Sequence, residues 1–202
     1  SKMSANLDKE RAKERRGEIL HTFERMVSYA VEHGVEGILI AGDLFDTKNI
    51  SATAKNTVLL GVTSHPQITF YYLRGNHDND NFLSELAEVP SNLKLFGSRW
   101  TTYEEDGGHI VISGLELSAE NANFAYTSLV LDSRKFNIVM LHGQESQGAA
   151  RDKAEVINLK ALRNKGIDYL ALGHVHAYKQ ERLDARGTYC YAGCLEGRGF
   201  DE

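Results

Sequence analysis

Four short clusters of polar residues in this sequence carry side chains that proteins use to bind transition metals. They are Gly42-Asp43-Leu44-Phe45-Asp46, Gly75-Asn76-His77-Asp78, His142 with Gly143, and Gly173-His174-Val175-His176. A mixture of carboxylate, amide and imidazole ligands suits manganese, iron or zinc better than calcium. No serine or cysteine stands in a convincing arrangement with a histidine for covalent catalysis. The chemistry that these clusters indicate is therefore that of a metal centre.

Each cluster follows an apolar run with the length and composition of a buried strand, at residues 38–41, 68–73, 138–141 and 167–172. Ligand sites of open α/β sheets lie beyond the carboxyl ends of the strands, so we expect the four clusters to meet in one crevice. Taken singly, a Gly-Asp pair is more often a turn, and a lone histidine at a strand end is more often structural. The four clusters together, in this order, favour a metal site.

The other elements alternate in the manner of an α/β protein. Apolar residues at intervals of three and four predict a long helix over residues 9–32, and a second helix is predicted from Ser51 toward Pro66. Short strands at 93–96, 101–103 and 109–113 are expected to form an antiparallel meander in a second sheet. A helix near residues 159–164 and a hairpin over 178–192 complete the prediction. Since no linker or repeat is visible, the 202 residues are expected to form a single domain.

The composition limits the class of protein. Hydrophobic residues make up 42% and charged residues 25% of the chain, which excludes a disordered or fibrous protein. No apolar run approaches the roughly 20 residues that cross a membrane. The start lacks the apolar core of a secretion signal, and the two cysteines make no disulfide framework, so we expect a cytoplasmic protein. A net charge of −5 and a pI of about 5.9 argue against a broad basic face for nucleic acid. They do not exclude a phosphate substrate, because bound metal supplies positive charge locally.

Residues outside the four clusters receive structural interpretations. Four histidines are interpreted as surface or packing residues: His21, His33, His65 and His109. Three charged residues lie near the clusters, and ordinary salt bridges are preferred for them over phosphate binding: Arg74, Glu196 and Arg198.

The ordered clusters resemble the motifs of the calcineurin-like metallophosphoesterases, which read D-x-H, G-D-x-x-[DH], G-N-H-[DE], a single H, and G-H-x-H. Residues 42–46, 75–78, 142 and 173–176 match the second to fifth motifs, and the resemblance extends from about Lys9 to the C-terminus. It implies an α/β fold in which two sheets form an α/β/β/α sandwich. Three stretches, at 34–46, 168–174 and 191–196, are similar to the SbcD-type DNA-repair exonucleases. That similarity implies DNA as the substrate and an SbcC-type ATPase as a partner.

The same resemblance implies a metal-binding role for five residues. Asp43 would bridge two divalent ions, with manganese as the first choice and iron or zinc as alternatives. One ion would be completed by Asn76, His142 and His174, and the other would be ligated by His176. Two ions about 3.5–4 Å apart would activate water and neutralise charge on the phosphoryl oxygens during in-line attack.

Two further residues take catalytic roles by the same resemblance. His77 would be the general acid that protonates the leaving alkoxide, and Asp78 would orient it and keep it basic.

The first motif of the superfamily has no counterpart before Asp43. A parallel sheet also requires a strand before the crossover helix at 9–32, yet only eight residues precede that helix. We therefore expect the natural polypeptide to extend further at the N-terminus, with natural loss of the motif as the alternative. The nuclease subfamily carries a substrate-capping domain, so we expect an extension at the C-terminus as well. For these 202 residues alone we expect one metal site, a defective second site, and weak or no activity.

Three functions remain open. The leading prediction is a metal-dependent phosphodiesterase, specifically a DNA exonuclease or endonuclease subunit, with a homodimer left open. The second is a phosphodiesterase or phosphatase for small molecules, which the acidic pI favours. The third is a non-catalytic scaffold on the same fold. Retention of His77 and Asp78 argues against a scaffold, because a binding module needs no proton donor.

Overall fold

The computed structural model describes residues 9–45, 51–75, 78, 81–84, 86–147 and 155–195. The described helices are α1 (Lys9–Glu32), α2 (Ala52–Thr63), α3 (Asn81–Ser84), α4 (Ala122–Ser128) and α5 (Leu159–Leu162). The described strands are β1 (Gly37–Ala41), β2 (Thr69–Leu73), β3 (Leu93–Leu95), β4 (Thr101–Glu105), β5 (Ile110–Gly114), β6 (Phe136–His142), β7 (Gln144–Ser146), β8 (Val156–Asn158), β9 (Tyr169–Gly173), β10 (Lys179–Arg182) and β11 (Thr188–Tyr191). A short 3-10 helix, Asp106–Gly108, joins β4 to β5. None of the described helices is both long enough and apolar enough to cross a membrane.

The described strands form three sheets. A parallel three-stranded sheet has the order β1-β2-β3. A six-stranded sheet has the order β10-β11-β9-β6-β5-β4, in which the four inner strands are parallel and the two edge strands antiparallel. The third sheet is a small parallel pair, β7 and β8.

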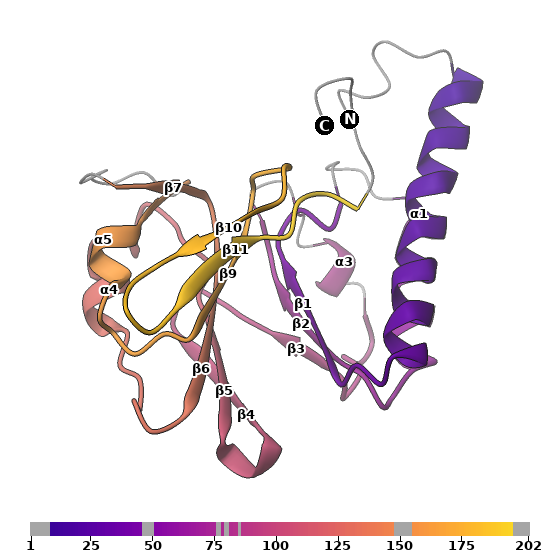
Figure 1. Ribbon diagram of the computed structural model, residues 1–202. Helices are drawn as coiled ribbons and strands as arrows, with labels where there is room; N and C mark the ends of the chain where they lie inside the picture. The colour runs from indigo at the N-terminus through magenta and orange to yellow at the C-terminus, as the bar shows by residue number, and fades with distance from the viewer. Residues whose placement is uncertain are drawn as a thin grey trace.

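The two larger sheets pack face to face between layers of helices (Figure 1). Helices α1 and α2 cover the outer face of the three-stranded sheet, where Phe23, Val27 and Val58 pack against the strands. Helices α4 and α5 cover the outer face of the six-stranded sheet, where Ala125 and Leu162 are buried. The molecule is thus the α/β/β/α sandwich that the sequence predicts.

The inner core lies between the two larger sheets, and an outer core lies between each sheet and its helices. Successive side chains of a strand belong alternately to the inner core and to an outer core. In β2, Tyr71 and Leu73 face the other sheet, whereas Phe70 and Tyr72 face the helices. In β6, β9 and β1 the residues of the inner face are Ile138, Met140, Tyr169, Ala171, Leu39 and Ala41. Because the period is two, the residue that continues each inner series points into the space between the sheets where the strands end.

Local interactions explain where helix α1 ends and where helix α2 begins. Helix α1 buries Phe23, Val27 and Ala30 on one stripe and is followed by Gly34, whose φ of +63° favours glycine. Helix α2 is capped by Ser51, whose hydroxyl accepts a hydrogen bond of 3.1 Å from the amide of Ala54.

Strand β3 corrects one sequence prediction. It does not belong to the second sheet as part of an antiparallel meander but pairs in parallel with β2. Asn92 accounts for this, because its side-chain amide donates to carbonyl oxygens at the end of α2 and in the connection from α2 to β2, including that of Ile68 at 3.0 Å. The carbonyl of Asn92 also accepts from the amide of Phe70 at 2.7 Å, so β3 begins beside the beginning of β2.

Other differences concern short elements. The helix predicted near residues 159–164 is a single turn, and Asn164 follows it with a φ of +60°. Helix α4, strands β7 and β8, and the one-turn α3 were not predicted, because three to seven residues are too few to display a hydrophobic period. The predicted hairpin is confirmed as β10 and β11.

Candidate metal centre

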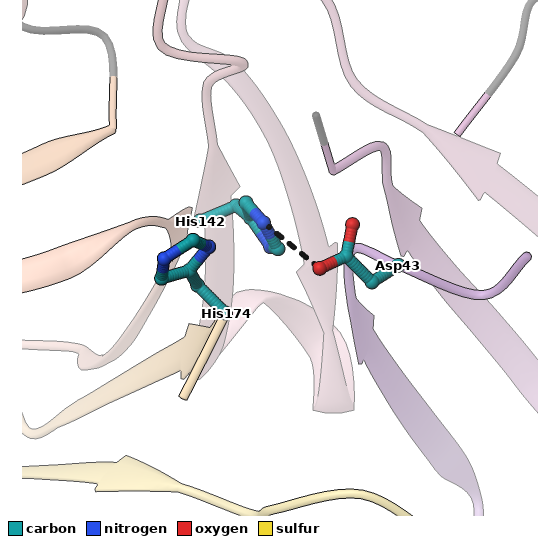
Figure 2. A group of neighbouring side chains, drawn as sticks. All are labelled: Asp43, His142 and His174. Atoms are coloured by element: carbon teal, nitrogen blue, oxygen red, sulfur yellow. Dashed lines mark ion pairs between the residues drawn. The ribbon is translucent and has the colours of Figure 1, made fainter. Parts of the chain in front are cut away.

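Asp43, His142 and His174 come together at one end of the sandwich (Figure 2). Asp43 follows β1 of the three-stranded sheet, His142 is the last residue of β6, and His174 follows β9. One ligand atom from each lies within 4.8 Å of the others. The carboxyl ends of strands from both sheets therefore meet here, as the sequence predicts for these three residues.

Strand alternation accounts for the direction of His142, and turns after the strands account for those of Asp43 and His174. His142 continues the inner series of Ile138 and Met140, so its ring faces the space between the sheets. Asp43 and His174 lie beyond the ends of β1 and β9, where their φ values of +53° and +105° depart from the strand conformation. The apolar inner core therefore borders polar side chains at the carboxyl ends of β1, β6 and β9.

Gly173 allows the two sheets to approach closely beside these residues. A Cβ atom at this position would overlap the carbonyl oxygen of Ala41 and would lie 2.9 Å from Nδ1 of His142. A side chain there would push β9 away from β1. Gly173 thus has a packing role that brings Asp43 of one sheet within reach of the histidines of the other.

The main chain fixes the tautomer of His142. Its Nδ1 lies 2.8 Å from the carbonyl oxygen of Ala41, and because a carbonyl can only accept, Nδ1 carries the proton. The lone pair is then on Nε2, which is buried without a hydrogen-bond partner in the described structure. Nε2 lies 3.4 Å from Oδ2 of Asp43. This is the arrangement of a metal-ligating histidine, in which one nitrogen is oriented by a carbonyl and the other faces the ion.

His174 presents a second buried nitrogen without a described partner, Nδ1. Burial lowers the pKa of His174 from its ordinary value of 6.5, and the rings of His142 and His176 act in the same direction against Asp43 and Glu155. Its ring is therefore neutral near pH 7 and has a lone pair to donate. Because buried polar atoms are nearly always satisfied, two unsatisfied imidazole nitrogens beside a carboxylate fit a divalent metal ion.

Two further residues were predicted as metal ligands, and the structure describes only one of them, His176. His176 is half-buried and close enough to affect the pKa of His174, but it is not a member of the 4.8 Å group. Its carbonyl oxygen accepts a 2.9 Å hydrogen bond from the amide of Cys194. Asn76 lies outside the described residues, so its role as a ligand stays a prediction.

Of the two predicted catalytic residues, the structure describes Asp78. Its Oδ1 accepts from the amide of Phe45 at 2.9 Å, and its Oδ2 accepts from the amide of Gly75 at 2.8 Å. Burial raises the pKa of Asp78, whereas these amides and a hydrogen bond from Tyr72 oppose the change. His77 lies outside the described residues, as do Asp46, Glu196 and Arg198.

Several residues that were interpreted as structural make local interactions. Arg74 forms a two-pronged ion pair with Glu116, at 2.8 and 2.7 Å, so the salt-bridge interpretation is confirmed for it. His33 and His65 follow α1 and α2, and their rings bond to carbonyl oxygens four residues earlier, in the last turns of these helices. His21 and His109 lie 3.5 and 3.6 Å from Glu24 and Asp106.

Sequence reasoning missed two contributors to the site. The carbonyl of Ala41 is a main-chain group and leaves no trace in a pattern of side chains. Tyr72 was counted only as an apolar strand residue, although its hydroxyl lies close enough to Asp78 to affect the pKa of that carboxyl. A tyrosine on the buried outer face of a strand is a signal that could have found it, because a buried hydroxyl needs a partner.

Comparisons with known proteins agree with this geometry. The chain is 31% identical over 188 residues to YhaO of Bacillus subtilis, an uncharacterized metallophosphoesterase, covering 88% of the chain and 45% of the relative. It is 25% identical over 181 residues to the DNA double-strand break repair protein Mre11 of Sulfurisphaera tokodaii, covering 84% and 46%. It is 26% identical over 211 residues to Mre11 of Aeropyrum pernix, covering 94% and 50%. The chain thus spans about half the length of the curated relatives it matches.

A solved structure shares the fold. TT1561 of Thermus thermophilus superposes with a TM-score of 0.64 at 16% identity, covering 87% of this chain and 84% of that one. Residues 16–178 match the family described as calcineurin-like phosphoesterase, a span that includes Asp43, His142 and His174. The chain belongs to the calcineurin-like phosphoesterase family.

Proposed function

We propose that this chain is a metal-dependent phosphodiesterase that acts on DNA. Membership of a phosphoesterase family supports the hydrolysis of phosphate esters. The relatives named as DNA double-strand break repair proteins support DNA as the substrate. The observation that carries the proposal is the convergence of one carboxylate and two buried imidazole nitrogens at the end of both sheets.

In this proposal Asp43, His142 and His174 hold a divalent ion together with Asn76, and Asp43 with His176 forms a weaker second site. The donor set favours manganese, iron or zinc. A bound ion would supply positive charge to the phosphoryl oxygens and acidify a water molecule.

The protein's own groups have separable tasks. The carbonyl of Ala41 keeps the proton on Nδ1 of His142, which leaves Nε2 free to bind. The fold excludes water from Nε2, since His142 is only 3% exposed. In the proposal His77 donates a proton to the leaving oxygen.

Metal binding is the first test. Isothermal titration of the metal-free protein with manganese chloride should show one tightly bound equivalent and a second that is weak or undetectable. Two equally tight equivalents would contradict the proposed inequality of the sites. A protein that binds no divalent metal would remove the basis of the proposal.

The substrate test compares manganese-dependent digestion of linear DNA with turnover of bis(4-nitrophenyl) phosphate. The proposal expects DNA cleavage that is slow, that stops on chelation and that is absent from His142→Ala. Cleavage that survives in His142→Ala would come from a contaminant or another site. The net charge of −5 favours a small phosphodiester as the second candidate, and turnover of that compound without DNA cleavage would select it.

The proton donor has its own test. His77→Ala should lower turnover by about 10²–10⁴-fold, the usual contribution of a general acid, while manganese affinity stays unchanged. Unchanged turnover would assign the proton transfer to another group.

Four further properties of the protein stay predictions. They are an SbcC-type ATPase partner, self-association to a homodimer, a single domain over residues 1–202 and a cytoplasmic location.

A further inference from the structure

We propose that Tyr72 and Asp78 form a clasp that positions Asp43 for metal binding. The clasp consists of the Tyr72 hydroxyl, the Asp78 carboxylate and the main-chain amides of Phe45 and Gly75. It deepens the proposed function and rests on it, because the residue being positioned is a proposed metal ligand. Tyr72 and Asp78 act here as positioning residues.

The carboxylate of Asp78 joins the loops that follow two neighbouring strands. The 2.9 Å bond to the amide of Phe45 reaches the loop after β1, and the 2.8 Å bond to the amide of Gly75 reaches the loop after β2. The amide of Asp78 also donates to the carbonyl of Gly75 at 3.2 Å, which closes the second loop as a turn. A single side chain therefore fixes the distance between the two loops.

Asp43 requires such a restraint because of its backbone. Its φ is +53°, and the preceding Gly42 has a φ of +87°. A left-handed conformation is unfavourable for a residue other than glycine and persists only where surrounding contacts enforce it. The bond from Asp78 holds the chain at Phe45, two residues beyond Asp43, and the side chain of Phe45 is itself buried against the helices.

Gly75 provides the second point of contact with Asp43. A Cβ atom on Gly75 would overlap Oδ1 of Asp43 and would lie 2.8 Å from Cε1 of His142. The main chain of Gly75 thus lies directly against both proposed ligands. By holding the amide of Gly75, Asp78 limits the directions in which the Asp43 carboxylate can turn.

Tyr72 anchors the clasp to the outer core. Its side chain is 2% exposed among the residues between the three-stranded sheet and the helices, and its hydroxyl lies close enough to the Asp78 carboxylate for each group to affect the pKa of the other. Burial and the negative charge of Asp78 raise the pKa of Tyr72, so the hydroxyl keeps its proton and donates it. The two amide bonds leave lone pairs on the Asp78 carboxylate for the Tyr72 hydroxyl and for the predicted contact with His77.

The neighbouring strand position offers a matched control. Tyr71 is also 2% exposed, and its hydroxyl also donates to a carboxylate, that of Glu105, but its side chain belongs to the inner core. Tyr72→Phe and Tyr71→Phe each remove one buried hydroxyl that lies close to a carboxylate. Only the first removes a member of the clasp.

Hydrogen exchange of the metal-free protein, followed by NMR, tests the clasp itself. In Asp78→Asn, the new NH₂ group faces an amide donor, so one of the two loop bonds is lost. The amides of Phe45 and Gly75 should then exchange at least about tenfold faster than in the wild type. Tyr72→Phe should accelerate both by a smaller factor, and Tyr71→Phe should leave both unchanged. Equal exchange in Tyr72→Phe and Tyr71→Phe would overturn the clasp.

Titration with manganese tests the positioning. Loss of a partner that orients a ligand costs about 10–100-fold in affinity, so Tyr72→Phe should weaken binding by about tenfold and Tyr71→Phe should not. Equal manganese affinity in the two variants would show that the clasp does not position Asp43. A wild-type protein without manganese binding would instead refute the proposed function, while hydrogen exchange would still decide whether the clasp exists.

Discussion

His142 shows how a single main-chain contact decides what a side chain can do. The bond from Nδ1 to the carbonyl of Ala41 leaves a lone pair on the other ring nitrogen, buried and facing Asp43. Rotation of the ring would leave the carbonyl of Ala41 without this donor. In its neutral form the ring therefore presents the tautomer that a divalent ion needs.

Replacement of this ring should remove metal binding. We expect His142→Ala to weaken manganese affinity by more than the roughly 10–100-fold that loss of an orienting partner costs, because a ligand atom itself is lost. Isothermal titration measures the change. His65→Ala is the matched control, since the ring of His65 also bonds to a carbonyl, that of Gly61 at 2.7 Å, but stands outside the site. Wild-type affinity in His142→Ala would exclude the residue as a ligand.

For individual residues, the sequence predicted the imidazole and carboxylate side chains of the site better than the groups that orient them. Asp43, His142 and His174 were found because each follows a run of strand type. The carbonyl of Ala41 and the hydroxyl of Tyr72 were not, because their roles depend on which strands cross. Partners far apart in the chain, such as Ala41 and His142, are set by tertiary packing and not by local pattern.

Among the elements, the N-terminal end of β9, which lies away from the candidate metal centre, is joined to its neighbours by hydrogen bonds and an ion pair. Asp168 precedes the strand and accepts a 2.8 Å hydrogen bond from the amide of Asn137 in β6. The guanidinium of Arg186 in the β10–β11 hairpin reaches the same carboxylate at 2.9 and 3.1 Å. One carboxylate thus aligns three segments of the six-stranded sheet.

Asp168→Asn should lower the free energy of unfolding by about 1–2 kcal/mol, since charged hydrogen bonds are lost and Arg186 is partly exposed to solvent. Burial alone would raise the pKa of Asp168, but Arg186 and the amide of Asn137 hold it below 3.8. The unfolded chain therefore binds the proton first, and the stabilisation is complete above pH 3.8 and is lost as the pH falls through the folded pKa.

Urea unfolding at about pH 6 and about pH 3 measures both effects. The difference between wild type and Asp168→Asn should shrink at the lower pH, and manganese affinity should not change. A difference that grows as the pH falls would contradict this account.

The prediction of elements succeeded where a segment was long and periodic. The bounds of α1 and β1 agree with the sequence prediction, since a 24-residue stripe and an unbroken apolar run are unambiguous. The pairing of β3 was wrong because three residues carry no information about direction, which is set by the side chain of Asn92.

For the whole molecule, the distance between the two sheets is set where Gly173 meets Ala41. Gly173→Ala should force the sheets apart and cost about 1–3 kcal/mol of unfolding free energy, the usual cost of overpacking, together with most of the manganese affinity. Gly97→Ala is the control, because nothing lies within 4 Å of a Cβ atom there. Urea unfolding and metal titration of both variants measure the outcome. Unchanged stability in Gly173→Ala would mean that the layers tolerate a methyl group between them.

The ligands of the candidate centre are divided between the two halves of the sandwich. Asp43 comes from the three-stranded sheet, and both histidines come from the six-stranded sheet. An ion bound by all three would act as a cross-link between the layers, in addition to the apolar contacts of the inner core and the bond from His142 to the carbonyl of Ala41. If the two sheets separate, the three ligands separate as well and the ion is released. The bound ion would therefore stabilise the folded protein, and its release would indicate that the two sheets have come apart.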